Sequence, residues 1–354
     1  MPVKTEPFPL LEGRKMTQTS NRQILLATRP NGMARLSDFE IVEREIPTPK
    51  DGEVLLRNTL VSMDPYQRNL MGNGSSELPS MDLGTPMSGP TVAVVEESNN
   101  PDFAKGDFVQ TWTGWQEYAV SDGSDLRKLD PDAAPLSTAL GVLGHTGLTA
   151  WVGMTKYLTD KPGGTFVVSA AAGSVGSMVA QMAKLRGHRV VGIAGGPAKC
   201  AYLMDEIGVD AAVDYKADDF IAQLAAAVPD GVDRYFDNVG DYMFEAVMPQ
   251  FNLNAQAVIC GTIAGYSDTE LPNRRDHLPL LLNLILYRFV EVRGFSLLDH
   301  LGSYPDFLAE AAPWVTEGKI KYSEEFIDDF EKIPETFLTL FEGGNTGKLI
   351  ARLG

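Results

Sequence analysis

Cysteines, long apolar runs and basic residues are all scarce in this sequence. Its 354 residues include two cysteines, Cys200 and Cys260, which cannot form a disulfide framework and fit a reducing cytosol. The apolar run from Leu278 to Leu286 is too short to span a bilayer and is followed by Arg288, and the N-terminus lacks an apolar signal core. We therefore expect a cytoplasmic protein with no membrane partner.

Basic side chains are outnumbered by acidic ones. The chain carries 47 acidic and 30 basic side chains, which gives a formal net charge of −17. Such a charge repels a phosphate backbone, so nucleic acid is excluded as the main partner. A nucleotide cofactor must therefore be held by local hydrogen-bond donors.

One βαβ unit is predicted between Thr165 and Cys200. The runs from Phe166 to Ser169 and from Arg189 to Ala194 are apolar without alternation, which is typical of strands covered on both faces. A helix is expected between them, from about Ser174 to Arg186.

The turn inside this unit resembles a dinucleotide-binding fingerprint. Ala171, Gly173 and Gly176 occupy its three spaced positions, with alanine in place of the first glycine. Gly173 lets the backbone approach a pyrophosphate, and Gly176 lets the helix pack closely on the sheet. The positive N-terminal end of the helix attracts phosphates. An ordinary tight turn is the alternative interpretation of the spacing alone.

The second strand of the unit ends without an acidic residue. Gly195 and Gly196 stand where a site for NAD carries an aspartate or glutamate that binds the ribose 2′-hydroxyl. Lys199 follows and can pair with a 2′-phosphate, although a solvated surface charge is the alternative for a single lysine. The sequence here favours NADPH as the cofactor.

The chain divides into two regions with different patterns of expected secondary structure. From Arg22 to about Ala139, short β-rich runs alternate with proline and glycine clusters, which predicts a partly closed β-barrel. From Gly141 onward, helices and strands alternate, which predicts a doubly wound parallel sheet. Among the later elements, we expect a helix over Tyr242 to Phe251 and a strand over Gln256 to Cys260.

The segment after about Lys319 has no further βα partner and is expected to return to the first domain. The predicted organisation is a disordered extension over residues 1–20, a β-rich catalytic domain over 21–140, a dinucleotide-binding domain over 141–316 and a returning segment over 317–354.

Several motifs in fixed order resemble those of the medium-chain dehydrogenase/reductase superfamily. The chain is most similar to the zinc-independent branch of leukotriene/prostaglandin reductases, plant alkenal double-bond reductases and bacterial curcumin reductases. The motifs are GLTAW at Gly147 to Trp151, AAAGSVG at Ala170 to Gly176, Asp214-Tyr215-Lys216, FDNVG at Phe236 to Gly240, ICG at Ile259 to Gly261 and GGNTGK at Gly343 to Lys348.

This resemblance implies a fold and a reaction. The fold is α/β, with a Rossmann doubly wound parallel sheet and a GroES-like, partly closed β-barrel domain. The reaction is the NADPH-dependent reduction of the C=C bond of an α,β-unsaturated ketone or aldehyde. Relatives are often homodimers, so the resemblance also implies a homodimer.

The resemblance further implies a set of site residues. Tyr66 and Tyr266 match positions where the family places tyrosines at the substrate, and we predict that both are catalytic. Packing is the alternative for Tyr66, and a plain turn is the alternative for Asn345. The predicted cofactor-binding residues are Ala171, Gly173, Val175, Gly176, Gly196, Lys199, Tyr215, Asn238 and Asn345.

One segment departs from the family pattern. Relatives often carry Met-Pro before the GLTAY motif, whereas this chain has His145-Thr146 before Gly147. Beside a nicotinamide, His145 can change the polarity of the pocket or donate a proton. A structural role is the alternative for a single histidine near a domain junction.

The zinc ligands of the superfamily's alcohol dehydrogenases are missing. Those enzymes use an early cysteine, a Gly-His-Glu segment and a further cysteine quartet. Here the corresponding segments read Met63-Asp64-Pro65 and Met87-Ser88-Gly89, and the two cysteines cannot form a quartet. We therefore expect no metal, so hydrogen-bond donors must stabilise negative charge on the substrate oxygen. A quinone reductase and a non-catalytic NADPH-binding protein remain the alternative functions.

Overall fold

The computed structural model of the protein describes residues 20–72, 79–159, 162–268 and 277–353. The predicted N-terminal extension over residues 1–20 lies outside these ranges except for Ser20.

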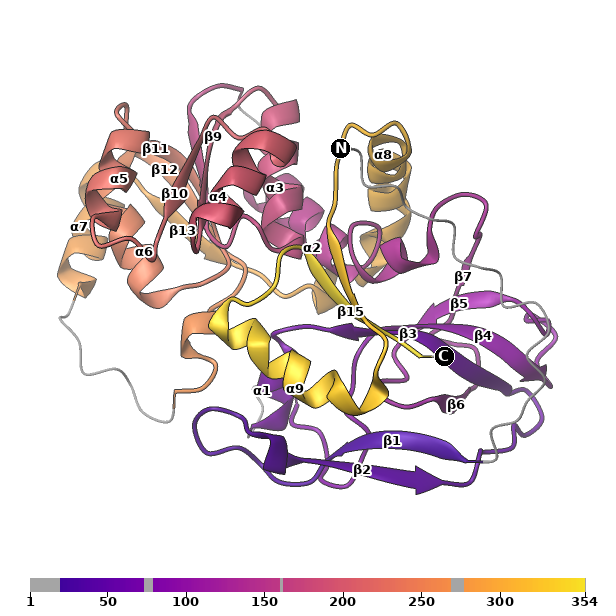
Figure 1. Ribbon diagram of the computed structural model, residues 1–354. Coiled ribbons are helices and arrows are strands. Elements are labelled where there is room, and N and C mark those ends of the chain that lie inside the picture. The colour runs from indigo at the N-terminus through magenta and orange to yellow at the C-terminus, as the bar shows by residue number, and fades with distance from the viewer. Residues whose placement is uncertain (1–19, 73–78, 160–161, 269–276, 354) are drawn as a thin grey trace.

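A six-stranded parallel sheet forms the second half of the molecule (Figure 1). Its strands lie in the order β10-β9-β8-β11-β12-β13 and are all parallel. From β8, the next two strands in sequence are added on one side and the later three on the other, which is the strand order of a Rossmann fold. The strands are β8 (Thr165–Val168), β9 (Arg189–Ala194), β10 (Ala211–Asp214), β11 (Val232–Asp237), β12 (Phe251–Ile259) and β13 (Glu291–Gly294).

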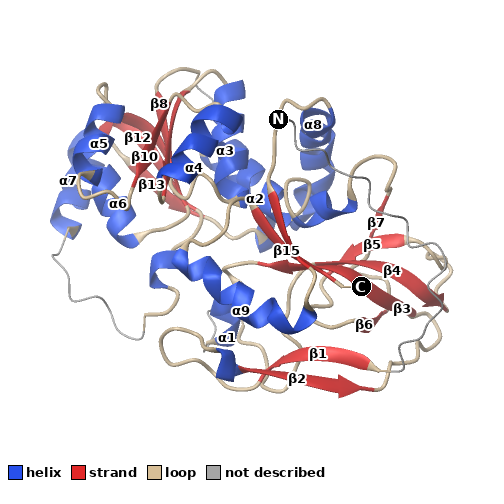
Figure 2. Ribbon diagram, in the orientation of Figure 1, coloured by secondary structure: helices blue, strands red, loops and turns tan. Residues whose placement is uncertain are grey.

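Helices cover both faces of this sheet (Figure 2). On one face, Val168 and Val190 pack with α2 (His145–Val152), α3 (Ser174–Leu185) and α8 (Tyr304–Thr316). On the other, Val167 and Val191 pack with α5 (Phe220–Ala227), α6 (Asp241–Val247) and α7 (Leu278–Arg288). Alternate residues of each strand therefore meet different apolar cores, which explains why these strands show no polar alternation.

Two predicted boundaries were wrong. The helix expected over Tyr242 to Phe251 ends at Val247, where Pro249 interrupts the helical pattern and a 3₁₀ turn (Met248–Gln250) follows. The strand expected over Gln256 to Cys260 begins at Phe251, which pairs with Val232 of β11, and the register shifts before Gln256 pairs with Arg234. The polar residues Asn252 and Asn254 interrupt the apolar pattern between these two pairs, so the sequence pattern missed the first part of the strand.

The β-rich half contains a seven-stranded sheet and the two-stranded pair of β1 (Asn21–Leu26) and β2 (Phe39–Arg44). Isolated bridges from Gln23 to Gln116 and from Leu25 to Pro86 join β1 to the rest of the domain. The sheet strands from this half are β3 (Val54–Met63), β4 (Thr91–Ser98), β5 (Phe108–Thr111), β6 (Tyr118–Ser121) and β7 (Arg127–Leu129).

The C-terminal segment completes the β-rich sheet (Figure 1). β15 (Lys348–Arg352) pairs antiparallel with β3, with Leu349 opposite Met63, and β14 (Glu324–Ile327) pairs parallel with β15. In α9 (Ile333–Leu338), Phe337 packs edge-on against the buried Trp115. The end of the chain thus lies beside residues that precede it by almost 300 positions.

Two further short helices flank the cleft between the halves. α1 (Gln67–Met71) follows β3, and α4 (Pro197–Tyr202) follows β9 and continues as a π-helical turn (Leu203–Ile207). Both begin next to residues that the sequence places in the site, namely Tyr66 and Gly196.

Candidate active site

A cavity of about 820 Å³ lies between the carboxyl edge of the parallel sheet and the β-rich half. Doubly wound folds bind their ligands at this edge, next to the reversal of strand order. Ten of the residues singled out by the sequence line the cavity together: Tyr66, His145, Gly173, Val175, Gly176, Lys199, Tyr215, Asn238, Tyr266 and Asn345.

Two predicted cofactor residues, Ala171 and Gly196, do not line the cavity. Ala171 is fully buried, and its N–H donates to the carbonyl oxygen of Ile193 at 2.9 Å. Gly196 has a φ of +90° and donates its N–H to Asp214 Oδ1 at 2.7 Å. Both residues therefore shape the turns whose neighbouring residues line the cavity, and their role in cofactor binding stays a prediction.

The glycine turn presents the start of α3 to the cavity. A Cβ atom at Gly176 would collide with the carbonyl oxygen of Ala170, so only glycine lets the helix lie this close to the turn. Ser174, the first residue of α3, shares a 2.7 Å hydrogen bond with Thr146 of α2. The positive helix end and its unpaired N–H groups can therefore receive a pyrophosphate.

The predicted 2′-phosphate site is assembled from two distant segments. Lys199 donates from Nζ to the carbonyl oxygens of Gly343, at 2.9 Å, and of Asn345. A Cβ atom placed on Gly343 would lie 3.4 Å from the Tyr215 hydroxyl, so Tyr215 contacts the same loop. Lys199 is therefore not a free surface charge, and burial lowers the pKa of its ammonium group.

A second bridge holds the C-terminal loop against the glycine turn. The N–H of Gly347 donates to the carbonyl oxygen of Ala172 at 2.8 Å, and Gly173 and Gly347 form an isolated parallel bridge. Asn345 is fixed by its own hydrogen bond to the Gly347 carbonyl oxygen, at 2.9 Å. The GGNTGK motif thus closes one side of the cavity.

Tyr66 and Tyr266 approach the cavity from different domains. Tyr66 precedes α1, and its buried hydroxyl has no hydrogen-bond partner among the described residues. Tyr266 follows β12 and a short 3₁₀ turn (Ile263–Gly265), and it interacts with Asn69 from the opposite domain. Burial raises the pKa of both phenols, well above the usual range for Tyr66, so both keep their proton at neutral pH.

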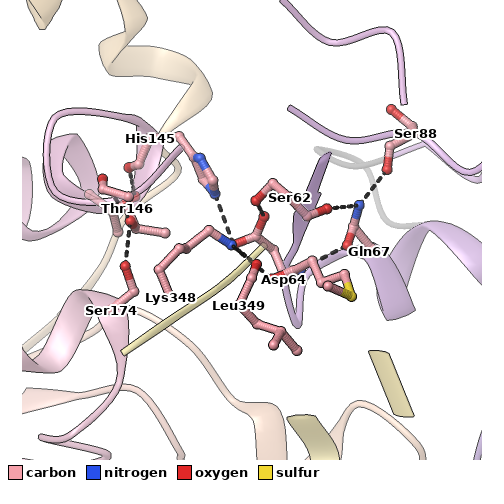
Figure 3. A network of polar contacts seen from close by, with 12 residues as sticks. Ser62, Asp64, Gln67, Ser88, His145, Thr146, Ser174, Lys348 and Leu349 are labelled. Atoms are coloured by element: carbon pink, nitrogen blue, oxygen red, sulfur yellow. Dashed lines mark hydrogen bonds and ion pairs between the residues drawn. The ribbon is translucent and has the colours of Figure 1, made fainter. Parts of the chain in front are cut away.

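Asp64 is the centre of a buried polar network that sequence reasoning missed (Figure 3). Its carboxylate accepts hydrogen bonds from Lys348 Nζ at 2.9 Å and from the Ser62 hydroxyl. Burial opposes the charge of Asp64, but His145 and Lys348 outweigh burial and hold the pKa of this carboxyl well below its usual range. A pair of opposite charges therefore lies in the floor of the cavity.

His145 lies next to this pair, at the first position of α2. Its Nε2 is 3.1 Å from Asp64 Oδ1, and its ring packs edge-on against those of Tyr66 and Trp112. The other ring nitrogen, Nδ1, is buried without a hydrogen-bond partner among the described residues. This unpaired nitrogen belongs to a side chain in the cavity wall.

No signal in the sequence connects Asp64 with Lys348, which is 284 positions away. Each residue occurs in a motif, yet a single acid or lysine is usually a solvated charge. Only the pairing of β15 with β3 brings them together.

Among the described residues, no group of three or more histidine, cysteine, aspartate or glutamate side chains is placed to hold a metal ion. Within the same ranges, no helix is both long enough and apolar enough to cross a bilayer.

Comparison with known proteins identifies the family. One family model, the N-terminal domain of oxidoreductase, matches residues 22–129, and another, zinc-binding dehydrogenase, matches residues 174–313. The NADPH-dependent curcumin reductase of Escherichia coli (strain K12) is 43% identical to the chain, and the match covers 94% of the chain and 97% of that protein. The chain belongs to the medium-chain dehydrogenase/reductase superfamily, in the branch of the curcumin, prostaglandin and alkenal reductases.

Two further relatives support this assignment. The NADP(+)-dependent 2-alkenal reductase of Nicotiana tabacum is 35% identical, with 94% of the chain and 97% of that protein covered. The crystal structure of CurA from Vibrio vulnificus in complex with NADPH matches with a TM-score of 0.90 and 41% identity. The match covers 94% of the present chain and 99% of the CurA chain. The predicted fold class and family are thus confirmed.

Proposed function

We propose that the protein is an NADPH-dependent reductase of the C=C bond of α,β-unsaturated ketones and aldehydes. The observation that carries this proposal is one cavity that joins a dinucleotide-binding turn to two partly buried phenols, in a chain whose relatives include curcumin and 2-alkenal reductases. Phenols that keep their proton are suited to a substrate whose oxygen gains negative charge during the reaction.

The residues of the cavity fit NADPH. The N–H groups at the start of α3, after Gly173, would hold the pyrophosphate, and Lys199 with Tyr215 would hold the 2′-phosphate. Asn238 and Asn345 would supply further polar contacts to the cofactor. Asn238 is preorganised for this, because its side chain donates to the Ser169 carbonyl oxygen at 2.8 Å.

The protein contributes hydrogen-bond donors to the reaction. Bound NADPH supplies a hydride, which adds to the β-carbon of the substrate. Negative charge then develops on the carbonyl oxygen, and we assign Tyr266 as the donor that holds this oxygen, with Tyr66 as a second donor or a wall of the pocket. A hydrogen bond that strengthens as charge develops lowers the barrier to hydride addition.

The experiment that tests this function compares an enone, an enal and a quinone with NADPH as the reductant, with absorbance of the nicotinamide as the readout. Turnover of the enone and enal with a product saturated at the C=C bond is the expected result. Turnover of the quinone alone would assign a quinone reductase. Binding of NADPH without turnover of any of the three would make the protein a non-catalytic binder.

We also propose that the reaction needs no zinc. The segments Met63-Asp64-Pro65 and Met87-Ser88-Gly89 lack the cysteine, histidine and glutamate that the zinc enzymes carry there, and the carboxylate of Asp64 is paired with the ammonium group of Lys348. Dialysis of the active protein against a chelator is expected to leave turnover unchanged. Stoichiometric zinc that is lost together with activity would contradict this proposal.

Two finer properties complete the proposed function. We propose a homodimer formed along β13, because β13 is the edge strand of the parallel sheet and the neighbouring α7 leaves large apolar side chains exposed. We propose a cytoplasmic location, because both cysteines are unpaired and NADPH is an intracellular reductant.

A further inference from the structure

We propose that His145 is a catalytic residue that delivers the proton to the α-carbon of the enolate. This inference rests on the proposed reduction of enones and assigns a step that Tyr66 and Tyr266 leave open. Hydride addition to the β-carbon produces an enolate, which still needs one proton to become the saturated product.

The orientation of His145 is fixed from one side. Nε2 lies 3.1 Å from Asp64 Oδ1, so in every protonation state with a hydrogen on Nε2 this atom donates to the carboxylate. The acceptor is itself immobile, since Lys348 donates to the same oxygen at 2.9 Å and Ser62 donates to the other. Nδ1 is therefore the ring atom left to meet a ligand.

Nδ1 is buried and has a free position for a hydrogen bond to a ligand. The His145 side chain is 6% exposed, and Nδ1 has no hydrogen-bond partner in the described part of the chain. A buried polar atom without a partner calls for an explanation, and contact with a ligand is one. Because His145 also lines the cavity, a bound substrate can supply the missing contact.

The charges around His145 favour a proton donor. The titratable groups that face it are Asp64 at the end of β3, Lys348 from β15 and Tyr66 before α1, and Glu324 of β14 faces Lys348 from beyond. The negative Asp64 and the positive Lys348 compensate each other. A protonated His145 therefore gives the cluster a net positive charge at the cavity wall, where the enolate is negative.

The two tyrosines are poor sources of this proton. Burial raises the pKa of both phenols, so each donates a hydrogen bond readily but gives up its proton at high cost. Histidine is the side chain that changes charge between about pH 5 and 8, which suits a group that must donate a proton and recover it in each turnover.

The proton transfer from His145 conserves atoms and charge. The Nδ1–H bond of the imidazolium breaks, and a C–H bond forms at the α-carbon with the electron pair of the enolate. The carbonyl group reforms, and neutral His145 keeps its Nε2–H bond to Asp64. A proton from solvent then restores the imidazolium, so each turnover consumes one enone, one NADPH and one proton.

The test uses an open-chain α-methyl enone, whose reduction creates a stereocentre at the α-carbon. In deuterated water, the parent protein is expected to place deuterium on one face of this carbon. His145→Gln keeps a donor to Asp64 but cannot transfer a proton, so water would protonate the enolate from both faces. Turnover of the variant should fall about 10-fold or more, and the limb of the pH profile where rate falls with rising pH should disappear.

The controls separate chemistry from folding. His145→Met tests the same loss with an apolar side chain, and the thermal unfolding midpoint and NADPH affinity show whether either variant is folded. His277→Gln changes a histidine that does not line the cavity and should leave the stereochemistry and the pH profile unchanged. If the α-methyl enone is not turned over, the pH profiles of parent and variants are measured with an unsubstituted enone. Loss of the falling limb in the His145 variants would support the proton-donor role, and its persistence would overturn that role.

The possible failures are distinguishable. If the parent does not reduce enones, the proposed function itself is wrong. Alternatively, the parent reduces enones while both His145 variants still place deuterium on one face of the α-carbon and still lose rate with rising pH as the parent does. In that case the proposed function stands and the role of His145 is overturned. Random α-deuteration by the parent would also overturn that role.

Discussion

At the scale of single residues, burial decides which chemistry each polar side chain in the cavity can perform. Burial raises the pKa of the Tyr66 and Tyr266 phenols further above neutral, so both stay protonated as hydrogen-bond donors. The same effect raises the pKa of the Cys260 thiol, which lines the cavity, to about 12. The thiolate is the nucleophilic form, so the raised pKa disfavours attack of Cys260 on electrophilic enones at neutral pH.

The substitution Tyr266→Phe tests the proposed stabilisation of the enolate oxygen. Removal of one such donor typically lowers turnover by about 10²–10³-fold. A hydroxyl of the cofactor ribose can share the role, so we expect a fall of roughly tenfold or more, with little change in NADPH affinity. Steady-state kinetics with an enone and a cofactor titration measure the two effects.

The control for this substitution is Tyr157→Phe, which removes a hydroxyl that bonds His300 outside the cavity and should not change turnover. Parent rates in both Tyr266→Phe and the Tyr66→Phe, Tyr266→Phe double variant would show that the enolate oxygen is stabilised elsewhere.

At the scale of elements, the C-terminal segment joins the two domains at the cavity. β15 pairs with β3, while the loop before β15 bonds the glycine turn and accepts two hydrogen bonds from Lys199. One segment therefore positions the floor of the cavity and the predicted 2′-phosphate site together.

The substitution Lys199→Ala tests the preference for NADPH. Charge-assisted hydrogen bonds contribute about 1.5–3 kcal/mol each, so the ratio of kcat/KM for NADPH over NADH should fall tenfold or more. Loss of the contacts to Gly343 and Asn345 affects both cofactors, so the ratio isolates the 2′-phosphate contact.

The matched control is Lys184→Ala, which removes a half-exposed lysine paired with Asp210 away from the cavity. It should keep the parent ratio. Equal efficiency of the parent with both cofactors, or an unchanged ratio in Lys199→Ala, would contradict the assignment.

The substitution Asp64→Asn tests the buried pair between β3 and β15. It leaves Lys348 buried without its counter-charge, so the free energy of unfolding at pH 7 should fall by about 3–5 kcal/mol. The folded-state pKa of Asp64 lies below the unfolded value of about 3.9. Its stabilising effect is therefore complete above that pH and is lost as pH falls through the folded pKa, so the difference between parent and variant should shrink in acid.

Denaturant unfolding at several pH values measures this difference. Asp328→Asn removes the same charge from an exposed pair with Arg352 and should change stability by less than about 0.5 kcal/mol. A pH-independent difference for Asp64→Asn would show that its charge is not the source of the stabilisation.

At the scale of the whole molecule, the parallel sheet has the two edge strands β10 and β13. Beside the edge strand β13, the exposed side chains of α7 include Leu286 and Tyr287, which are 62% and 71% exposed. A net charge of −17 opposes association, so apolar contact must supply the attraction between two copies.

The proposed dimer is tested by the mass of the particle in light scattering. The parent should have twice the mass of the chain, and Leu286→Glu should shift the equilibrium toward the monomer. Ile221→Glu, on the exposed face of α5, is the control and should leave the mass unchanged. A monomeric parent would refute the proposed dimer.

The sequence predicted those parts of the fold that local pattern determines. β9 matches its expected bounds to the residue, because the apolar run ends at glycine turns on both sides. The glycine turn could also be predicted from the sequence, because the spacing of Gly173 and Gly176 follows from the close approach of α3 to the sheet.

The sequence by itself therefore determined the βαβ unit, the family and ten of the residues that line the cavity. Only the tertiary structure decided that Asp64, Lys348 and His145 form one charged network, and that Lys199 holds the C-terminal loop. The physical reason is that periodicity and turn chemistry act over a few residues, whereas the charge and orientation of a buried group depend on partners that strand pairing brings from the far end of the chain.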